Sequence, residues 1–330
     1  FRRREQRFID ENGVVTHLLV IESLFYRFIQ INPWHNFLLL KGLLRNIQKE
    51  FKFNIIHANV VSPCGVVAML LAKHFKVPYI ITEHWTRLKQ YLKNNKLSFM
   101  GKRAYANAGK VTAVSADLKN TIVQAFEVNP QHVQVVPNVV DTAIFYYRDI
   151  YQETPGVLRF VFVGNLRPPK RPDLLINALN RLQKETGKSV LLHVFGAGKM
   201  QQELDAQKEQ LKIIWHGVQP KPAIAKLHNE VEMLLHASEN ETFCLAVAEA
   251  ICCGTPVVVS ELPVLGEVVE AGSSGILAPN TVEGFYACIV KALKIKWNRK
   301  QIAAHNAGRF TPEIVGRQFC DIYDQVQKSN

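Results

Sequence analysis

Two glutamates, Glu241 and Glu249, flank an apolar stretch within residues 237–261, ASENETFCLAVAEAICCGTPVVVSE. The apolar residues predict a helix that stops at Gly254. Its N-terminus, near residues 242–245, presents unpaired backbone N–H groups and a partial positive charge, which suit a diphosphate. The spacing turns the second glutamate about 80° away from the first, so both reach one cleft only in a suitable helix orientation. The pattern predicts either an anion site with two carboxylates or an ordinary helix start, where a glutamate only interacts favourably with the helix dipole.

Short β-branched runs alternate with segments of helical period, a pattern typical of parallel sheets covered by helices. In the first half, strands are predicted at 14–21, 53–59, 77–84 and 109–115, and helices at 36–51, 65–75 and 116–126; the stretch 133–141 closes this half. After a loop-like stretch, strands are predicted at 158–166, 189–198, 212–218, 231–238 and 255–261, with a helix at 171–185. We expect two α/β domains with a ligand site in the cleft between them, near the carboxyl ends of the strands.

Composition narrows the class of function. The 330 residues are 48% hydrophobic, enough for two domains with separate cores. The formal charge of +12 favours anionic partners such as phosphates, acidic lipids or nucleic acid. No helix-turn-helix, RRM or KH signature supports nucleic acid, and no G-x-G-x-x-G follows an early strand as in a nicotinamide oxidoreductase. The apolar runs are far shorter than the roughly 20 residues of a membrane span. The six cysteines lack a C-x-x-C pair, which favours free thiols in a reducing cytoplasm.

Four segments carry a resemblance to a known family. The most specific is the glutamate stretch followed by GEVVEAGSSGILAP at 266–279. The others are FVGNLRPPKRPDLLINAL (162–179), VQVVPNVVDTAIF (133–145) and NIIHANVVSPCGVVAMLLAKHFKVPYIITEH (54–84). From about residue 50 onward the chain resembles the GT-B glycosyltransferases of family four (glycosyl transferases group 1), retaining enzymes that move a sugar from a nucleotide donor.

The resemblance implies an α/β fold of two Rossmann-like domains facing a cleft. Residues 1–145 would form the acceptor-side domain, shortened at its start. Residues 146–310 would bind the nucleotide sugar, and residues 311–330 would form a helix that packs back on the first domain. The implied reaction transfers a sugar from a nucleotide-diphosphate sugar to a saccharide or lipid-linked acceptor with retention of configuration, in polysaccharide or glycolipid biosynthesis.

The resemblance also implies a role for each matching residue. Glu241 would contact hydroxyls of the donor sugar at the reaction centre, and His84 would lie beside that sugar. The alternative for His84 is a strand-end histidine paired with backbone. Glu249 would bind the ribose, and Lys170 would neutralise the diphosphate. The donor-binding set is Gly164, Asn165, Lys170, Phe243, Cys244, Leu245 and Glu249, of which the three consecutive residues act through their amides. Three other histidines near strand ends are interpreted as packing residues: His193, His216 and His236.

These residue types fit the departure of a nucleoside diphosphate. Negative charge builds on the leaving phosphates, and a lysine with helix-end amides stabilises it electrostatically. The chain has no D-x-D motif for a divalent ion, so we expect neither a metal nor another cofactor. The resemblance suggests same-face attack by an acceptor hydroxyl, with the donor phosphate as base. Glu241 would then orient the sugar and form no covalent bond to it.

Three features depart from the family pattern. Asn165 follows Gly164 where the family has arginine, and Arg167 is a candidate replacement for that charge. A single glycine, Gly266, precedes Glu267 in the loop beside the donor sugar. The family's first strand and glycine-rich loop are not found before FRRREQRF. These departures leave a non-catalytic sugar-nucleotide-binding protein or an inactive truncated transferase as the alternative function, with a GT-B epimerase as an alternative enzyme.

The expected location is the cytoplasm, with peripheral contact to the inner face of the cell membrane if the acceptor is lipid-linked. Basic residues that could meet anionic lipid are Arg2, Arg3, Arg4, Lys41, Arg45, Lys49 and Lys52. The alternative is a solvated basic face without a lipid partner.

Overall fold

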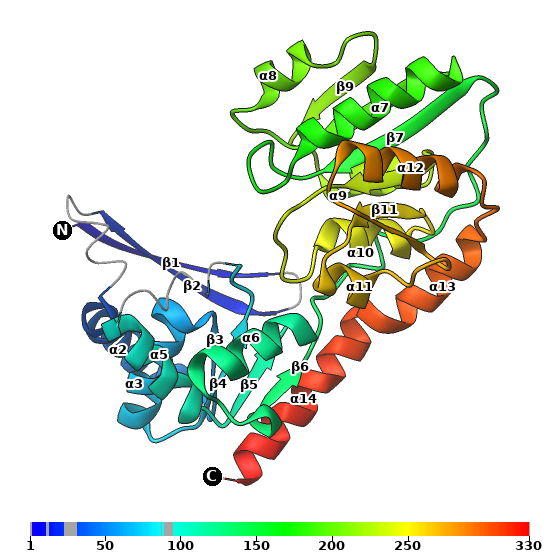
Figure 1. Ribbon diagram of the computed structural model, residues 1–330. Helices are drawn as coiled ribbons and strands as arrows, with labels where there is room; N and C mark the ends of the chain where they lie inside the picture. Colours follow the sequence, from blue (N-terminus) through cyan, green and yellow to red (C-terminus); the bar gives the residue numbers. More distant parts are fainter. Residues whose placement is uncertain (1, 11–12, 23–31, 87, 89–94, 330) are drawn as a thin grey trace.

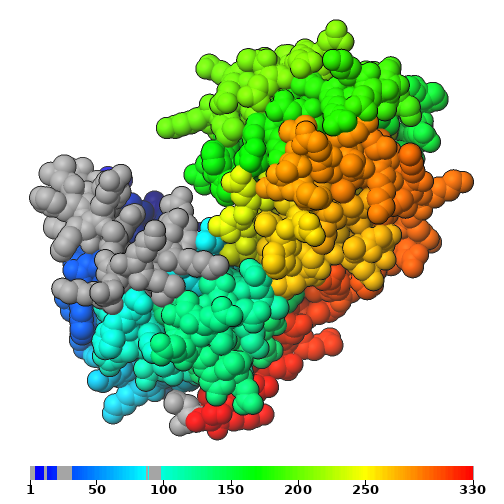
Figure 2. Space-filling view, in the orientation of Figure 1, coloured from blue at the N-terminus to red at the C-terminus, as the bar shows by residue number. Residues whose placement is uncertain are grey.

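The computed structural model describes residues 2–10, 13–22, 32–86, 88 and 95–329. Two parallel sheets, each packed against helices, form two Rossmann-like units (Figure 1). The space-filling view shows the surface hollowed between the two units (Figure 2). The α/β class predicted from the alternation of strands and helices is confirmed.

The first sheet has four parallel strands in the order β3-β4-β5-β6. They are β3 (Ile56–Asn59), β4 (Tyr79–Glu83), β5 (Lys110–Ala113) and β6 (Val133–Val135). Its other elements are α2 (Pro33–Glu50), η1 (Val61–Gly65), α3 (Val66–Phe75), α5 (Asn95–Ala106), α6 (Ala116–Phe126) and η2 (Pro130–His132). Every residue of β4 is buried, as expected for a central strand covered on both faces.

The second sheet has six parallel strands in the order β12-β11-β10-β7-β8-β9. They are β7 (Val157–Val163), β8 (Ser189–Phe195), β9 (Lys212–Gly217), β10 (Met233–His236), β11 (Val257–Ser260) and β12 (Gly275–Ala278). The helices are α7 (Pro172–Thr186), α8 (Gln201–Ala206), α9 (Lys221–His228), α10 (Leu245–Cys252), α11 (Pro263–Val268), α12 (Val282–Leu293) and α13 (Arg299–Phe310). The strand order reverses between β7 and β10, which places the loops that follow these two strands side by side.

The final helix, α14 (Pro312–Lys328), is separated from α13 by Thr311 alone, which caps the first turn of α14. Its buried side chains Val315, Ile322 and Val326 form a small core with Ile80 of β4. Helix α14 therefore packs on the first sheet, although the preceding helix belongs to the second unit (Figure 1).

Strands β1 (Arg2–Ile9) and β2 (Val15–Glu22) form a separate two-stranded antiparallel ribbon. The strand predicted at 14–21 is therefore present, but its inclusion in the parallel series was wrong. The hydrogen bond from the Asp10 amide to the Val14 carbonyl, with Gly13 in the left-handed region at φ 78°, reverses the chain here. A turn this short can join only antiparallel strands.

Candidate active site

The loops after β7 and β10 meet at the carboxyl edge of the second sheet. The Glu239 amide donates to the Pro169 carbonyl at 2.8 Å, and an ion pair of 2.7 Å joins Arg171 to the Glu239 carboxylate. These contacts bring Lys170 of the first loop against Glu241 of the second. Two residues that lie 71 positions apart in the chain thus share one site.

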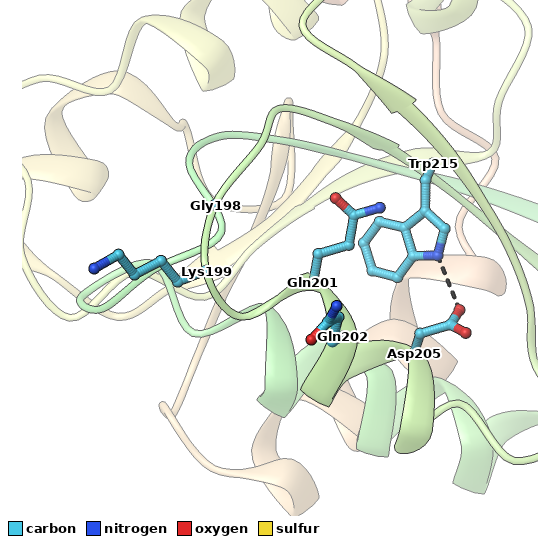
Figure 3. A pocket seen from close by; sticks show the side chains of 6 residues that line it. All are labelled: Gly198, Lys199, Gln201, Gln202, Asp205 and Trp215. Carbon is cyan, nitrogen blue, oxygen red and sulfur yellow. Dashed lines mark hydrogen bonds between the residues drawn. The ribbon is translucent and has the colours of Figure 1, made fainter.

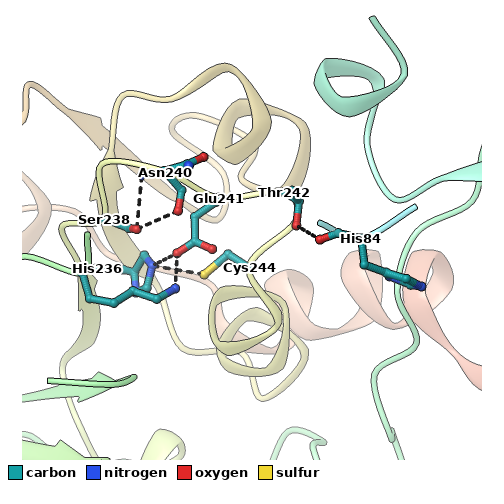
Figure 4. A network of polar contacts seen from close by, with 8 residues as sticks. His84, His236, Ser238, Asn240, Glu241, Thr242 and Cys244 are labelled. Atoms are coloured by element: carbon teal, nitrogen blue, oxygen red, sulfur yellow. Dashed lines mark hydrogen bonds and ion pairs between the residues drawn. The ribbon is translucent and has the colours of Figure 1, made fainter. Parts of the chain in front are cut away.

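Glu241 lies between two basic side chains. Its Oε1 atom is 2.5 Å from Lys170 Nζ and 2.7 Å from His236 Nε2. The Glu241 side chain is only 8% exposed, against 24% for Lys170. Figure 4 shows the carboxylate turned toward His236 and Cys244, away from the opposite side of the loop where Thr242 meets His84.

These neighbours set the charge of Glu241. Burial alone would raise the pKa of the carboxyl, but His236 and Lys170 outweigh burial and lower this pKa to about 2. Burial likewise opposes charge on His236, yet Cys244 and Glu241 raise the pKa of the imidazole to about 9. Glu241 is therefore an ionised, acceptor-only group at neutral pH, suited to hydroxyl donors.

The N-terminus of α10 follows directly. The helix begins at Leu245, and among the described residues no side chain caps its first amides. Cys244 holds a left-handed backbone with φ 75°, a conformation that glycine adopts at lower cost. The predicted amide set of Phe243, Cys244 and Leu245 thus lies at an open helix end that suits an anion.

Glu249 lies further along α10 and is partly buried. Burial raises the pKa of its carboxyl to about 7, against the opposing effect of Lys221 at the start of α9. Hydroxyl groups would stabilise a buried carboxyl of this kind, because their hydrogen bonds replace those to the water that burial removed. The ribose role of Glu249 stays a prediction.

The other predicted donor residues lie on the loop that carries Lys170. Gly164 follows β7, and a Cβ on neighbouring Gly196 would come within 1.9 Å of the Gly164 carbonyl oxygen, so the backbones approach closely here. Asn165 and Arg167 are both exposed. The Lys170 amide donates to the Arg167 carbonyl at 3.0 Å, so the two residues share one turn, and the role of Arg167 as a replacement charge stays a prediction.

His84 comes from the first unit, at the end of β4. Its carbonyl oxygen accepts a hydrogen bond from Thr242 Oγ1 at 3.0 Å, while its ring Nε2 lies 3.1 Å from Asn59 Oδ1. Figure 4 shows the ring pointing away from Glu241. The structure therefore brings the His84 backbone, and not its ring, to the Glu241 loop, and the predicted reaction-centre role of this ring stays a prediction.

Glu83, which the sequence reasoning missed, organises the backbone around His84. Its fully buried carboxylate accepts hydrogen bonds from the amides of Val61, His84 and Trp85 and from the Tyr105 hydroxyl, at 2.7–3.0 Å. A buried charge with this many donors fixes the loop after β4. Its position as the one charged residue of the strand segment YIITE was the available signal, because a buried glutamate requires partners.

The interpretation of the three strand-end histidines was correct in part. His193 Nδ1 lies 2.9 Å from His216 Nε2, and their rings stack at 5.2 Å. His236, however, is not merely a packing residue, because its ring bonds to Glu241. The sequence signal was its place between a buried strand and a polar loop, since a buried imidazole seeks a polar partner.

One group of potential metal ligands occurs at this site among the described residues. His236, Glu241 and Cys244 offer nitrogen, oxygen and sulfur atoms that all lie within 4.8 Å of one another. Zinc accepts such donors, but the Lys170 ammonium contacts the same glutamate oxygen and would repel a cation. The expectation of a metal-independent reaction stays a prediction.

A separate polar pocket of about 740 Å³ lies near the carboxyl ends of β8 and β9. It is lined by Gly198, Lys199, Gln201, Gln202, Asp205 and Trp215. Figure 3 shows the Trp215 indole donating to the Asp205 carboxylate, at 3.0 Å. None of the predicted site residues lines this pocket.

Comparisons with known proteins agree with this architecture. The profile of "Glycosyl transferases group 1" matches residues 147–309, and that of "Glycosyltransferase Family 4" matches residues 2–144. An uncharacterised glycosyltransferase of Methanocaldococcus jannaschii is 26% identical over 241 residues, which cover 71% of this chain and 63% of that protein. A D-inositol 3-phosphate glycosyltransferase of Frankia alni is 27% identical over 287 residues, covering 78% of this chain and 70% of that protein. The chain thus spans less than two thirds of the first of these relatives.

Two solved structures share the fold. HepE of Anabaena, in complex with UDP, superposes with a TM-score of 0.71 at 19% identity, covering 85% of this chain and 81% of that one. Sucrose-phosphate synthase of Thermosynechococcus elongatus gives a TM-score of 0.73 at 18% identity, covering 87% and 77%. The chain therefore shares its overall fold with these two structures.

Proposed function

The chain belongs to the GT-B glycosyltransferases of family four, and on that basis we propose that it transfers a sugar from a nucleoside-diphosphate sugar to a saccharide or lipid-linked acceptor, with retention of configuration. The observation that carries the proposal is the Lys170–Glu241 pair beside the open N-terminus of α10. The lysine cation and the free helix amides would bind the diphosphate, and the ionised carboxylate would bind the sugar attached to it. Because similar structures contain UDP or UDP-glucose, a UDP-sugar is the first donor to test.

Each residue has a defined part in the proposed reaction. Lys170 and the amides of Phe243 to Leu245 stabilise the charge that builds on the leaving diphosphate. Glu241 accepts hydrogen bonds from the sugar hydroxyls, and Glu249 accepts them from the ribose. The acceptor oxygen forms its bond to the anomeric carbon on the face from which the diphosphate departs. The acceptor proton passes to the departing phosphate oxygen, so no covalent bond to the protein is needed.

In this proposal the acceptor binds to the first unit. Residues 1–145 supply the acceptor side, residues 146–310 the donor side, and residues 311–330 the helix that joins them. His84 and Asn59 stand at the carboxyl edge of the first sheet, where an acceptor would enter. Cleft closure would then exclude water from the activated donor.

Helix α2 supports a membrane role for the first unit if the acceptor is lipid-linked. Trp34 and Leu38, which are 59% and 64% exposed, share one helix face with Lys41, Arg45 and Lys49. A face with apolar and basic residues suits the surface of an anionic membrane. The side chains of Arg2 and Arg3 lie outside the described residues, and no described helix is long and apolar enough to cross a bilayer.

Thermal stabilisation by UDP, GDP, ADP and their common sugar conjugates, with and without magnesium, tests the proposal. A ligand at 100 times its dissociation constant adds about 2.7 kcal/mol to the stability of the folded chain. We expect stabilisation by one nucleoside diphosphate without a need for magnesium, and loss of that stabilisation in Lys170→Ala and Glu249→Ala. No stabilisation by any of them would contradict the proposal. Binding without transfer to any acceptor would instead indicate a non-catalytic sugar-nucleotide-binding protein.

A further inference from the structure

His236 has no part in the function proposed above, yet it contacts the central carboxylate. It ends β10, its side chain is 1% exposed, and its ring stacks on Phe162 of β7 at 6.2 Å with an interplanar angle of 13°. Its Nε2 atom lies 2.7 Å from Glu241 Oε1 and 3.3 Å from Cys244 Sγ. The other ring nitrogen has no hydrogen-bond partner among the described residues, so every polar contact of the ring is directed at the site.

The two cations beside Glu241 differ in their freedom to move. Lys170 lies on a loop, and its long side chain is partly exposed, so it can turn toward a ligand. His236 is fixed by its strand and by Phe162, and it cannot reach the cleft. The proposed function asks Lys170 to serve the diphosphate, which would remove this lysine from Glu241. A buried carboxylate that loses its last cation pays a large desolvation cost.

We propose that His236 is a positioning residue that keeps Glu241 ionised and correctly oriented while Lys170 moves from Glu241 to the donor diphosphate. Before the donor binds, both cations share the carboxylate. After it binds, Lys170 neutralises phosphate and His236 alone holds Glu241, whose second oxygen stays available to the sugar. This inference rests on the proposed function, because it needs a diphosphate as the ligand of Lys170.

The electrostatics agree with this assignment. Among the residues that the structure describes, the His236 ring contacts the Glu241 carboxylate, the Cys244 side chain and the apolar Phe162, with Lys170 behind the carboxylate. Burial opposes the imidazolium, but Cys244 and Glu241 together raise the pKa of His236 to about 9. The imidazole is therefore protonated at neutral pH, the condition under which we expect sugar transfer.

A double-mutant cycle on the ligand-free chain tests the shared carboxylate. We expect Lys170→Met and His236→Gln each to leave a folded protein, because the remaining cation compensates Glu241. The two changes together should raise the equilibrium constant for unfolding about tenfold more than the product of the two single effects. Urea unfolding of the wild-type chain and the three variants measures these constants. Strictly multiplicative effects would overturn the inference without reference to any nucleotide.

UDP binding by calorimetry supplies the second test. In His236→Gln, Lys170 must stay with Glu241, so UDP affinity should fall about tenfold. Adding Glu241→Gln to that variant should restore the affinity, because a neutral side chain no longer needs the lysine. A merely structural role for His236 would not respond to the second change. His228→Gln is the matched control, since this histidine is fully buried against Phe145 and should leave UDP affinity unchanged.

The outcomes separate the two proposals. If the wild-type chain binds UDP and His236→Gln binds it equally well, the inference fails and the proposed function stands. If the wild-type chain binds no nucleoside diphosphate, both fail. If the affinity falls but Glu241→Gln does not restore it, His236 acts only through packing and the inference is overturned.

Discussion

Glu241 acquires its charged state from two residues, one of which lies far away in the sequence. Lys170 stands 71 positions earlier and His236 only five. The resemblance singled out Lys170 and Glu241, but it could not show that they contact each other in the ligand-free chain. Under the proposed function, donor binding would therefore exchange one partner of Lys170 for another, instead of filling an empty site.

Glu241→Gln separates binding from transfer. The amide keeps the shape of the side chain but loses its charge, so we expect kcat to fall about a hundredfold while affinity for free UDP is kept. Steady-state kinetics with the donor identified by thermal stabilisation measures the first effect, and calorimetry with UDP measures the second. Full activity in this variant would remove Glu241 from the reaction.

Glu249 predicts a pH dependence of stability. Burial raises the pKa of its carboxyl from 4.5 to about 7, so between these values the folded chain binds a proton that the unfolded chain has released. Stability from this group is therefore full below about pH 4.5 and is lost as pH rises through 7, by about 3 kcal/mol in total.

Urea unfolding of the wild-type chain and Glu249→Gln at several pH values between 5 and 8 measures this effect. As pH rises, the unfolding free energy of Glu249→Gln should increase relative to that of the wild-type chain. Glu153→Gln, at an exposed position, is the control. A difference that does not change with pH would show that the Glu249 carboxyl is not shifted by burial.

At the scale of elements, the parallel strands were predictable because burial on both faces demands continuous β-branched runs. Strand β4 and the valines of β11 show this pattern, and both lie within the predicted segments. The pairing of β2 was not predictable, because a strand's own residues do not say which neighbour it meets. The left-handed Cys244 was equally hidden, since the usual signal for that conformation is glycine.

The exposed face of α2 predicts lipid binding. Replacement of Lys41, Arg45 and Lys49 by glutamate should abolish co-flotation with vesicles that contain acidic phospholipid, because each basic residue contributes about 1 kcal/mol near such a surface. The same replacement of Lys291, Lys294 and Lys300, which are exposed in the second unit, is the charge-matched control. Binding of the wild-type chain should also weaken with salt. Equal flotation of both triple variants would reject a membrane role for α2.

At the scale of the whole molecule, hydrogen bonds join the two units at two places beside the polypeptide crossings. The Glu267 carboxylate accepts hydrogen bonds from the amides of Ala116 and Asp117, at 2.6 and 2.8 Å, where α6 begins in the first unit. Thr242 of the second unit donates a hydrogen bond from its Oγ1 atom to the His84 carbonyl oxygen of the first unit, at 3.0 Å. The glutamate that the sequence placed in the donor-sugar loop thus caps a helix of the opposite unit.

Removal of the Glu267 cap from α6 should lower the stability of the folded chain. Glu267→Ala leaves two helix amides without their carboxylate, so we expect a loss of about 1–2 kcal/mol in unfolding free energy. Glu261→Ala, at an exposed position just before α11, should change stability by less than about 0.5 kcal/mol. Chemical denaturation of both variants makes the comparison, and equal losses would show that the contact between units carries no stability.

The chain passes between the two units twice, once after Val140 and once between Phe310 and Pro312. The Val140 amide donates to the Phe310 carbonyl at 2.8 Å, so the two passages are tied together at one point. The two passages therefore lie beside each other, and this point is where we expect a rotation of one unit relative to the other to be centred. Thr311 alone separates α13 from α14, and Pro312 has a restricted φ, so little backbone is free to absorb that rotation. We expect a small torsion at Thr311 to displace the far ends of both units, and with them the mouth of the cleft, by a much larger distance.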